Sequence, residues 1–147
     1  MAEDLRPRVL VADDGEENRY VLSRVLGAAG YDCVETGIGR GALEIAQTLP
    51  DVMILDVNLP DISGYEVCRR IKHDLRTAFI SVLQISASFI SSEDRVRALE
   101  AGVDGYLTRP IDRRRGFRAA RKVVYGYGAI AITGELRVSL FSLFTAR

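Results

Sequence analysis

The chain has 147 residues, no net formal charge and 48% hydrophobic residues, which suits a single domain with one core. No apolar run reaches the roughly 18 residues of a membrane-spanning helix, and the N-terminal MAEDLRPR contains no apolar signal core. Residues 1–112 carry 12 basic and 19 acidic side chains, which disfavours direct nucleic-acid binding, whereas residues 113–147 carry 8 basic and 1 acidic. We therefore expect a soluble, cytoplasmic protein with two reduced cysteines.

Short apolar runs alternate with segments of helical period up to about residue 112. This alternation is typical of βαβ units, in which helices cover both faces of a parallel sheet. The pattern predicts an α/β fold with five parallel strands. The expected strands are residues 8–12, 31–35, 52–56, 79–85 and 103–107.

Local signals mark several helix boundaries. A serine with an acidic residue three positions later has the spacing of a capping box, and a glycine where an apolar period stops is a typical helix end. These signals are Ser63 with Glu66 and Ser91 with Asp94 at helix starts, and Gly30 and Gly102 after helices expected near 16–29 and 92–101.

Two of the expected strands end in acidic residues. Asp13 and Asp14 follow the apolar run 9–12, and Asp56 follows the run 52–55. The carboxyl ends of parallel strands meet at one edge of a sheet, where open α/β sheets bind their ligands. If the two strands are neighbours, three carboxylates converge there and require a counter-cation. Carboxylate oxygens suit Mg²⁺, and a carboxylate beside a bound cation can attack a phosphoryl group.

The fourth and fifth strands bring further polar groups to the same edge. The fourth ends in Ser86-Ala87-Ser88, which supplies a hydroxyl, and the fifth ends in Tyr106-Leu-Thr-Arg109-Pro110, which supplies a fixed cation. Both kinds of group are suited to binding phosphoryl oxygens.

The ordered set of these motifs resembles the receiver domain of two-component response regulators over about residues 7–112. The complete set is far more specific than any one motif. The resemblance implies a flavodoxin-like, doubly wound (βα)5 fold. The matching segments are Asp13-Asp14, Leu55-Asp56-Val-Asn-Leu-Pro60-Asp-Ile-Ser-Gly64, Ile85-Ser86-Ala87 and Tyr106-Leu-Thr-Arg109-Pro110.

The resemblance also implies the chemistry of a phosphorelay. Asp56 would accept a phosphoryl group from a phosphohistidine on a histidine kinase or a histidine phosphotransfer protein. Asp13, Asp14, Asp56 and the backbone carbonyl of Asn58 would hold Mg²⁺. Such a domain is a signalling phosphoprotein that catalyses only its own phosphorylation and dephosphorylation. No effector domain follows within this sequence, so we expect output through contacts with another protein.

By the same resemblance, Ser86 and Ala87 would bind the phosphoryl oxygens and Tyr106 would swing inward as Ser86 moves toward them. The residues alone read differently, with Ser86 as a strand cap and Tyr106 as a half-buried strand aromatic. Arg109 stands where receivers typically have lysine, and its planar fork cannot reproduce a compact ammonium ion. This departure supports a rival hypothesis, a non-catalytic docking module. The bond to Pro110 is a candidate cis peptide.

The basic C-terminal part departs from the resemblance. A last helix is expected at about 114–125, so that residues 1–125 form the receiver domain and residues 126–147 an atypical apolar tail. A hairpin, a partner-binding segment and disorder all stay open for the tail. We predict that the tail and the 91–127 face pair two copies of the chain, because exposed apolar patches mark partner surfaces.

A glycine motif offers a remote alternative from another class. Gly37-Ile-Gly39-Arg-Gly-Ala42 matches the relaxed dinucleotide fingerprint, with Asp56 at about the distance of a ribose-binding acid. This pattern would indicate a dinucleotide-binding oxidoreductase fragment. It follows the second strand rather than the first, and it leaves Asp13 and Asp14 without a role.

Overall fold

The computed structural model describes residues 6–28, 30–86 and 91–108. In this part of the chain, strands and helices alternate, and all strands belong to one parallel sheet of order β2-β1-β3-β4-β5. The strands are β1 (Arg8–Ala12), β2 (Asp32–Thr36), β3 (Val52–Asp56), β4 (Ser81–Ser86) and β5 (Gly105–Thr108). The helices are α1 (Glu16–Ala28), α2 (Gly39–Ala46), α3 (Gly64–His73) and α4 (Ser92–Ala101).

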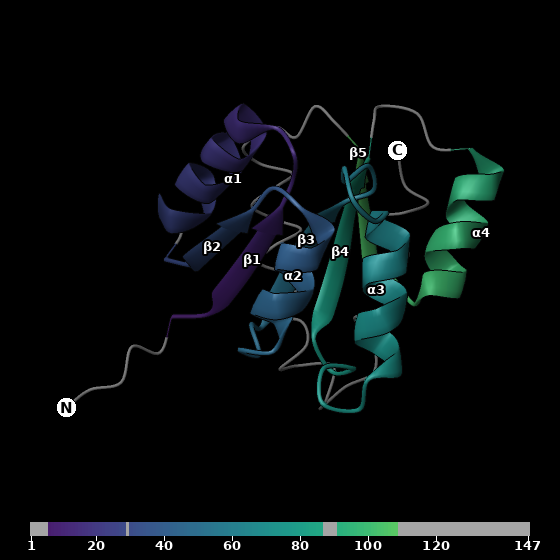
Figure 1. Ribbon diagram of the computed structural model, residues 1–147. Helices are drawn as coiled ribbons and strands as arrows, with labels where there is room; N and C mark the ends of the chain where they lie inside the picture. The colour runs from purple at the N-terminus through teal and green to yellow at the C-terminus, as the bar shows by residue number, and fades with distance from the viewer. Residues whose placement is uncertain (1–5, 29, 87–90, 109–147) are drawn as a thin grey trace, which may run out of the picture.

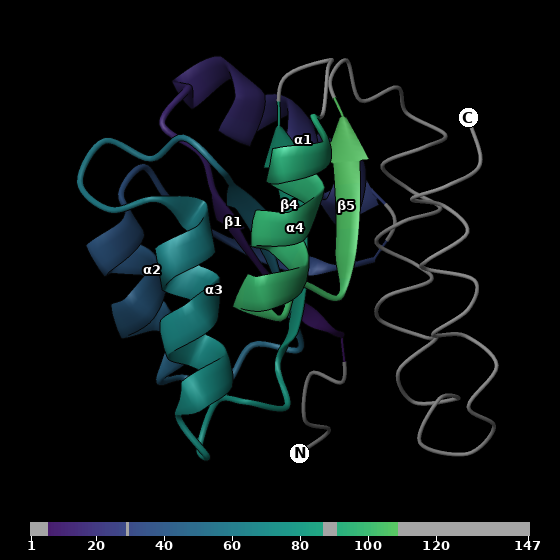
Figure 2. The same ribbon diagram turned by 90° about the vertical axis from the view of Figure 1, so that its right-hand side faces the viewer.

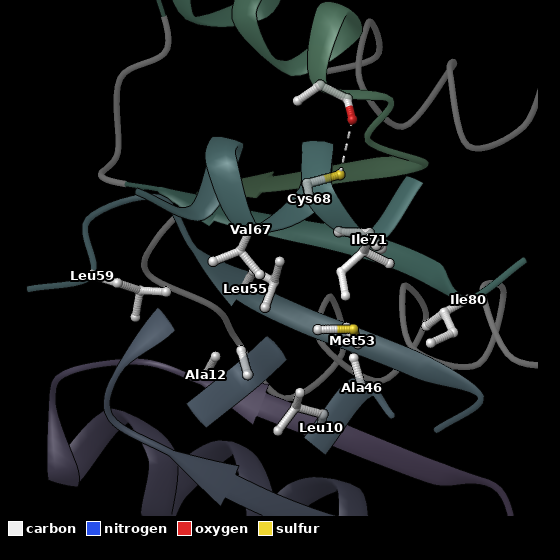
Figure 3. Packing of buried hydrophobic residues seen from close by; sticks show 13 residues of the cluster. Leu10, Ala12, Ala46, Met53, Leu55, Leu59, Val67, Cys68, Ile71 and Ile80 are labelled. Atoms are coloured by element: carbon white, nitrogen blue, oxygen red, sulfur yellow. Dashed lines mark hydrogen bonds between the residues drawn. The ribbon is translucent and has the colours of Figure 1, made fainter. Parts of the chain in front are cut away.

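Helices cover both faces of the sheet, as predicted (Figures 1 and 2). On one face, α1 buries Leu22 and Leu26 against side chains of β1, β3 and β4. On the other face, residues of α2, α3 and α4 pack on the same strands. Figure 3 shows this second layer, in which Cys68 of α3 donates a hydrogen bond from Sγ to the Ala101 carbonyl at 3.3 Å. The strand order is the flavodoxin-like one, with its switch point between β1 and β3.

The helix starts agree with the sequence signals at one position and differ at the other. At Ser91 and Asp94 both hydrogen bonds of the capping box are present. At Ser63 only half of the box forms, since the Ser63 hydroxyl accepts from the Glu66 amide. The Glu66 carboxylate is instead paired with Arg69 and Arg70, which removes it from the reciprocal bond.

Strand boundaries were predicted to the residue for β1 and β3, whereas β4 begins later than expected. Phe79 is 60% exposed in a turn, and the Ile80 amide donates to the Thr77 carbonyl rather than to a neighbouring strand. The fifth strand also begins later, at Gly105. The Asp104 carboxylate accepts from the Val82 amide at 2.8 Å, in place of a backbone carbonyl.

The cysteines are free, as expected, with Cys68 buried and Cys33 half-buried. Burial raises the pKa of Cys33 to about 11 and that of Cys68 to about 12, so both thiols stay protonated near neutral pH. None of the helices within the described residues has the length and apolar character needed to cross a membrane. The expected helix at 114–125 and the tail at 126–147 lie outside the described residues.

Candidate functional site

Three carboxylates converge at the ends of β1 and β3. One carboxylate oxygen from each of Asp13, Asp14 and Asp56 lies within 4.8 Å of the others. Asp13 is 4% exposed and Asp56 is 3% exposed, whereas Asp14 faces solvent. The two strands are direct neighbours, with Ala12 paired to Leu55, so their carboxyl ends emerge side by side. The convergence expected from the sequence is therefore present.

Backbone hydrogen bonds hold these two strand ends in place. The Asp13 amide donates to the Thr36 carbonyl at 3.1 Å, and the Asp13 carboxylate accepts from the Gly15 amide at 2.8 Å. Arg19 of α1 donates from Nη1 to the Asp13 carbonyl at 2.6 Å. The Arg19 contact was missed at the sequence level, because nothing in the spacing indicated that this arginine turns back toward the strand.

On the β3 side, the Asp56 carboxylate accepts from the Asn58 amide at 3.1 Å. The Val57 amide donates to the Ile85 carbonyl of β4, and the Gly64 amide donates to the Val57 carbonyl. These bonds fix the turn that leaves β3 toward α3. Asn58 is exposed beside this turn, and its predicted metal-binding role through the carbonyl stays a prediction.

The donor set fits a hard divalent cation. Two buried carboxylates and a third that is exposed to solvent offer oxygen ligands, which suit Mg²⁺, a cation that retains several waters in protein sites. In a site of this kind the cation neutralises charge on phosphoryl oxygens. The carboxylates of Asp13 and Asp56 are buried, and like charges this close repel each other strongly, a repulsion that a bound cation would offset.

The predicted switch residues are only partly within the described residues. Tyr106 in β5 is 5% exposed, more buried than the half-buried aromatic that its position alone suggested. Its hydroxyl lies 3.3 Å from the hydroxyl of Tyr65 in α3, a neighbour that the sequence did not indicate. Ser86 is the last residue of β4, one position beyond Ile85, the register partner of Asp56. Ala87, Arg109 and Pro110 lie outside the described residues.

The glycines of the dinucleotide-like motif have a packing explanation. A Cβ on Gly39 would lie 2.4 Å from Cγ1 of Ile62, and one on Gly41 would lie 2.1 Å from the Thr36 hydroxyl oxygen. The motif follows β2, which is the edge strand next to β1, not the strand at the switch point. The dinucleotide alternative is therefore not supported.

The start of α2 is tied to the turn that follows β3. The Asp61 carboxylate accepts from the amides of Gly39 and Arg40 at 2.6 and 2.9 Å. These bonds, that from the Arg40 amide above all, lower the pKa of Asp61 to about 2. Asp61 thus caps the start of α2 from a distant segment of the chain. Its carboxylate has this structural role and is not a member of the acid cluster.

The comparisons with known proteins agree with this fold. The family model of the response regulator receiver domain matches residues 9–121. The chain belongs to this family and is a receiver domain of two-component signalling.

Three bacterial regulators illustrate the relation. The DNA-binding dual master transcriptional regulator RpaA of Synechocystis sp. is 37% identical over 107 residues, which are 72% of this chain and 44% of RpaA. The polar-differentiation response regulator DivK of Brucella ovis is 32% identical over 104 residues, 70% of this chain and 84% of DivK. The response regulator PleD of Caulobacter vibrioides is 41% identical over 106 residues, which are 71% of this chain and only 23% of PleD. The chain thus spans less than half of RpaA and of PleD.

Solved structures show the same architecture. The chemotaxis response regulator CheY4 of Vibrio cholerae superposes with a TM-score of 0.75 at 28% identity, covering 80% of this chain and 98% of CheY4. A BeF3-activated DrrB receiver domain gives a TM-score of 0.74 at 26% identity, covering 82% of this chain and 99% of DrrB. The flavodoxin-like fold predicted from the sequence is confirmed.

Proposed function

We propose that this domain accepts a phosphoryl group on Asp56 from a phosphohistidine of a histidine kinase or histidine phosphotransfer protein. The convergence of Asp13, Asp14 and Asp56 within 4.8 Å carries the proposal. A carboxylate oxygen of Asp56 attacks phosphorus, the bond from phosphorus to the histidine nitrogen breaks, and an acyl phosphate forms. The buried location of Asp56 limits access of water to the reacting oxygen.

The metal is part of the proposal. Asp13, Asp14, Asp56 and the Asn58 carbonyl would hold Mg²⁺, which when bound supplies positive charge to the transferring oxygens. Ser86 and the Ala87 amide would bind those oxygens. Tyr106 would report the change to the surface formed with α4. The domain would catalyse only its own phosphorylation and dephosphorylation.

The test of this function uses a small-molecule donor. We expect the full chain to gain the mass of one phosphate when incubated with acetyl phosphate and Mg²⁺, and to gain none when EDTA replaces Mg²⁺. Intact-mass spectrometry measures both samples, and peptide mapping after borohydride reduction locates the acyl phosphate. No phosphate with Mg²⁺ would instead favour the non-catalytic receiver.

That rival function rests on Arg109, in place of the lysine typical of receivers. A docking module would bind its partner with or without a phosphoryl group. Phosphorylation that leaves the β5 and α4 surface unchanged would indicate an intermediate case, in which the acceptor chemistry is retained and the coupling is lost. We favour the phosphoacceptor, because arginine can still donate to phosphoryl oxygens.

We further propose that residues 1–125 form the receiver domain and that residues 126–147 serve pairing of two copies through the 91–127 face. Val96 and Leu99 of α4 are 52% and 55% exposed on this face, which supports an interface there. The acidic main part argues against direct nucleic-acid binding by this domain. A cytoplasmic location fits a phosphohistidine donor.

The pairing proposal predicts a mass difference in solution. The full chain is expected to sediment as a dimer at tens of micromolar, and a version ending at Tyr127 as a monomer, because the truncation removes most of the apolar tail. Analytical ultracentrifugation at two salt concentrations measures both proteins. Monomers in both cases would exclude the tail as a dimerisation element.

A further inference from the structure

A group of buried and half-buried polar side chains lies on the α3 and α4 side of the sheet, apart from the acid cluster. The Tyr65 hydroxyl of α3 donates to the Asp94 carbonyl in the first turn of α4 at 3.4 Å. It therefore has lone pairs available for the Tyr106 hydroxyl of β5, which lies 3.3 Å away. One hydroxyl of α3 thus contacts both α4 and β5, through residues 29 and 41 positions further along the chain.

The far end of this connection is a well-fixed helix start. The Asp94 carboxylate accepts from both the amide and the hydroxyl of Ser91, and the Asp94 amide donates to the Ser91 hydroxyl. These bonds hold the first turn of α4 together. A side chain that holds the Asp94 carbonyl holds this whole turn against α3 and against Tyr106.

Gln84 of β4 lies beside the same tyrosine. Its side chain is completely buried in β4, and among the described residues neither its amide oxygen nor its amide nitrogen has a hydrogen-bond partner. Gln84 pairs in register with Leu55 on one side and Tyr106 on the other, so the three side chains share one face of the sheet. A buried amide without partners destabilises the arrangement that encloses it.

Tyr106 is the register neighbour of Gln84 toward β5. Outward movement of the Tyr106 ring would remove one of the side chains beside the buried amide. The next residue in β4, Ile85, pairs with Asp56 and accepts from the Val57 amide. Gln84 is thus adjacent in β4 to Ile85, the residue that pairs with the proposed phosphoacceptor Asp56.

We propose that Tyr65 and Gln84 are positioning residues for Tyr106, with opposite effects. The Tyr65 hydroxyl holds Tyr106 buried beside the first turn of α4, and the Gln84 amide favours its displacement outward. The two side chains together keep the Tyr106 positions close enough in free energy for phosphorylation to shift them. The inference rests on the proposed function, in which phosphorylation of Asp56 acts on Tyr106.

The titration behaviour of Tyr65 is consistent with this role. Burial, together with the hydrogen bond to Tyr106, raises the pKa of Tyr65 well above its ordinary value of 10. The hydroxyl therefore keeps its proton at all physiological pH values and can donate to the Asp94 carbonyl throughout. A pH-dependent release of Tyr106 through Tyr65 is not expected.

The test measures the exposure of Tyr106 directly. The full chain is labelled with 3-fluorotyrosine, and the Tyr106 fluorine resonance is identified from its absence in Tyr106→Phe. Its shift between H2O and D2O reports solvent exposure, before and after addition of acetyl phosphate and Mg²⁺. Intact mass of the same samples reports phosphorylation of Asp56 separately.

We expect Tyr65→Phe to lower the ratio of buried to outward Tyr106 about two- to fivefold, since a hydroxyl contact is lost while the ring remains. Gln84→Met, which keeps length and volume, should raise the ratio about threefold or more. Tyr20→Phe is the matched control, because Tyr20 is 61% exposed on α1 and should leave the resonance unchanged.

The outcomes separate this inference from the proposed function. Identical Tyr106 resonances in the parent, Tyr65→Phe and Gln84→Met, with and without phosphorylation, would overturn the positioning roles while phosphate on Asp56 still upholds the acceptor. Without phosphate on Asp56, the proposed function fails. The unphosphorylated samples then still decide whether Tyr65 and Gln84 set the position of Tyr106.

Discussion

Asp56→Asn is expected to abolish phosphorylation by acetyl phosphate and, in the absence of Mg²⁺, to make the protein more stable. The first effect follows because the amide oxygen of asparagine is a poor nucleophile for phosphorus. The second follows from the geometry, because Asp56 is 3% exposed and its carboxylate lies within 4.8 Å of those of Asp13 and Asp14. Two like charges at that distance repel by about 3 kcal/mol at an effective dielectric constant of about 20.

Hydrogen bonds and other polar contacts of these carboxylates offset part of this repulsion, so the net gain in the free energy of unfolding should be about 1–3 kcal/mol. Urea unfolding with EDTA measures it, and repetition with Mg²⁺ should show a smaller stabilisation of Asp56→Asn by the metal than of the parent. Intact mass gives the phosphorylation state of both proteins.

Asp51→Asn is the matched control, because Asp51 directly precedes β3, whereas Asp56 is the last residue of that strand. The Asp51 carboxylate accepts from the Arg8 amide at 2.8 Å, away from the cluster. This variant should keep full phosphorylation and should lose rather than gain stability. Undiminished labelling of Asp56→Asn would place the acceptor at another residue and contradict the site assignment.

The parts of the fold that followed from the sequence are those dominated by burial. Residues 9–12 and 52–55 are unbroken apolar runs, and in the structure they are completely or almost completely buried. A strand that is buried on both faces is apolar along its whole length, so the apolar run and the strand have nearly the same bounds. This explains why the predicted bounds of β1 and β3 agree with the structure to the residue. Phe79 was wrongly assigned to β4, because the sequence alone does not distinguish an aromatic residue exposed in a turn from one buried in a strand.

The acid cluster was predictable for a related reason, with one step that needed the family resemblance. Parallel strands place their carboxyl ends at one edge, so Asp13, Asp14 and Asp56 had to emerge on the same side. That β1 and β3 are neighbours depends on the strand order, which no local pattern encodes. The order implied by the resemblance supplied this step.

Contacts that depend on how a helix packs on the sheet could not be predicted from the sequence. Tyr65 and Tyr106 are 41 positions apart, and their hydroxyls meet only because of where α3 lies on the sheet. Gln84 did carry a signal that was not used. Gln84 is a polar residue inside the apolar run 79–85. If such a side chain is buried, its amide must be hydrogen-bonded or it destabilises the fold, so burial at this position is informative. The structure buries it completely.

Gly64→Ala is the second change with a large expected effect, and it concerns the turn that holds Asp56. A Cβ on Gly64 would lie 2.2 Å from the backbone oxygen of Asp56 and 3.0 Å from Cα of Val57. Both contacts are with backbone atoms, which cannot move aside as a flexible side chain can. The turn between β3 and α3 must therefore shift, at a cost of about 3 kcal/mol or more in the free energy of unfolding.

The displaced turn carries the phosphoacceptor with it. The Gly64 amide donates to the Val57 carbonyl at 2.8 Å, so movement at Gly64 is transmitted to the end of β3. We expect Gly64→Ala to lower the rate of labelling by acetyl phosphate by tenfold or more even where the protein remains folded, because misplacement of a reacting group by about 1 Å can reduce a rate a hundredfold. Circular dichroism under the labelling conditions identifies the folded fraction.

Gly27→Ala provides the comparison that isolates the steric effect. Gly27 lies in the last turn of α1, and a Cβ there meets no atom of the described part of the chain within 4 Å. Alanine should stabilise this helix by about 0.5–1 kcal/mol and leave the labelling rate unchanged. If Gly64→Ala unfolds at the same urea concentration as the parent and is labelled equally fast, the turn has room that the described backbone does not show. The close approach of Gly64 to Asp56 would then not be what positions the acceptor.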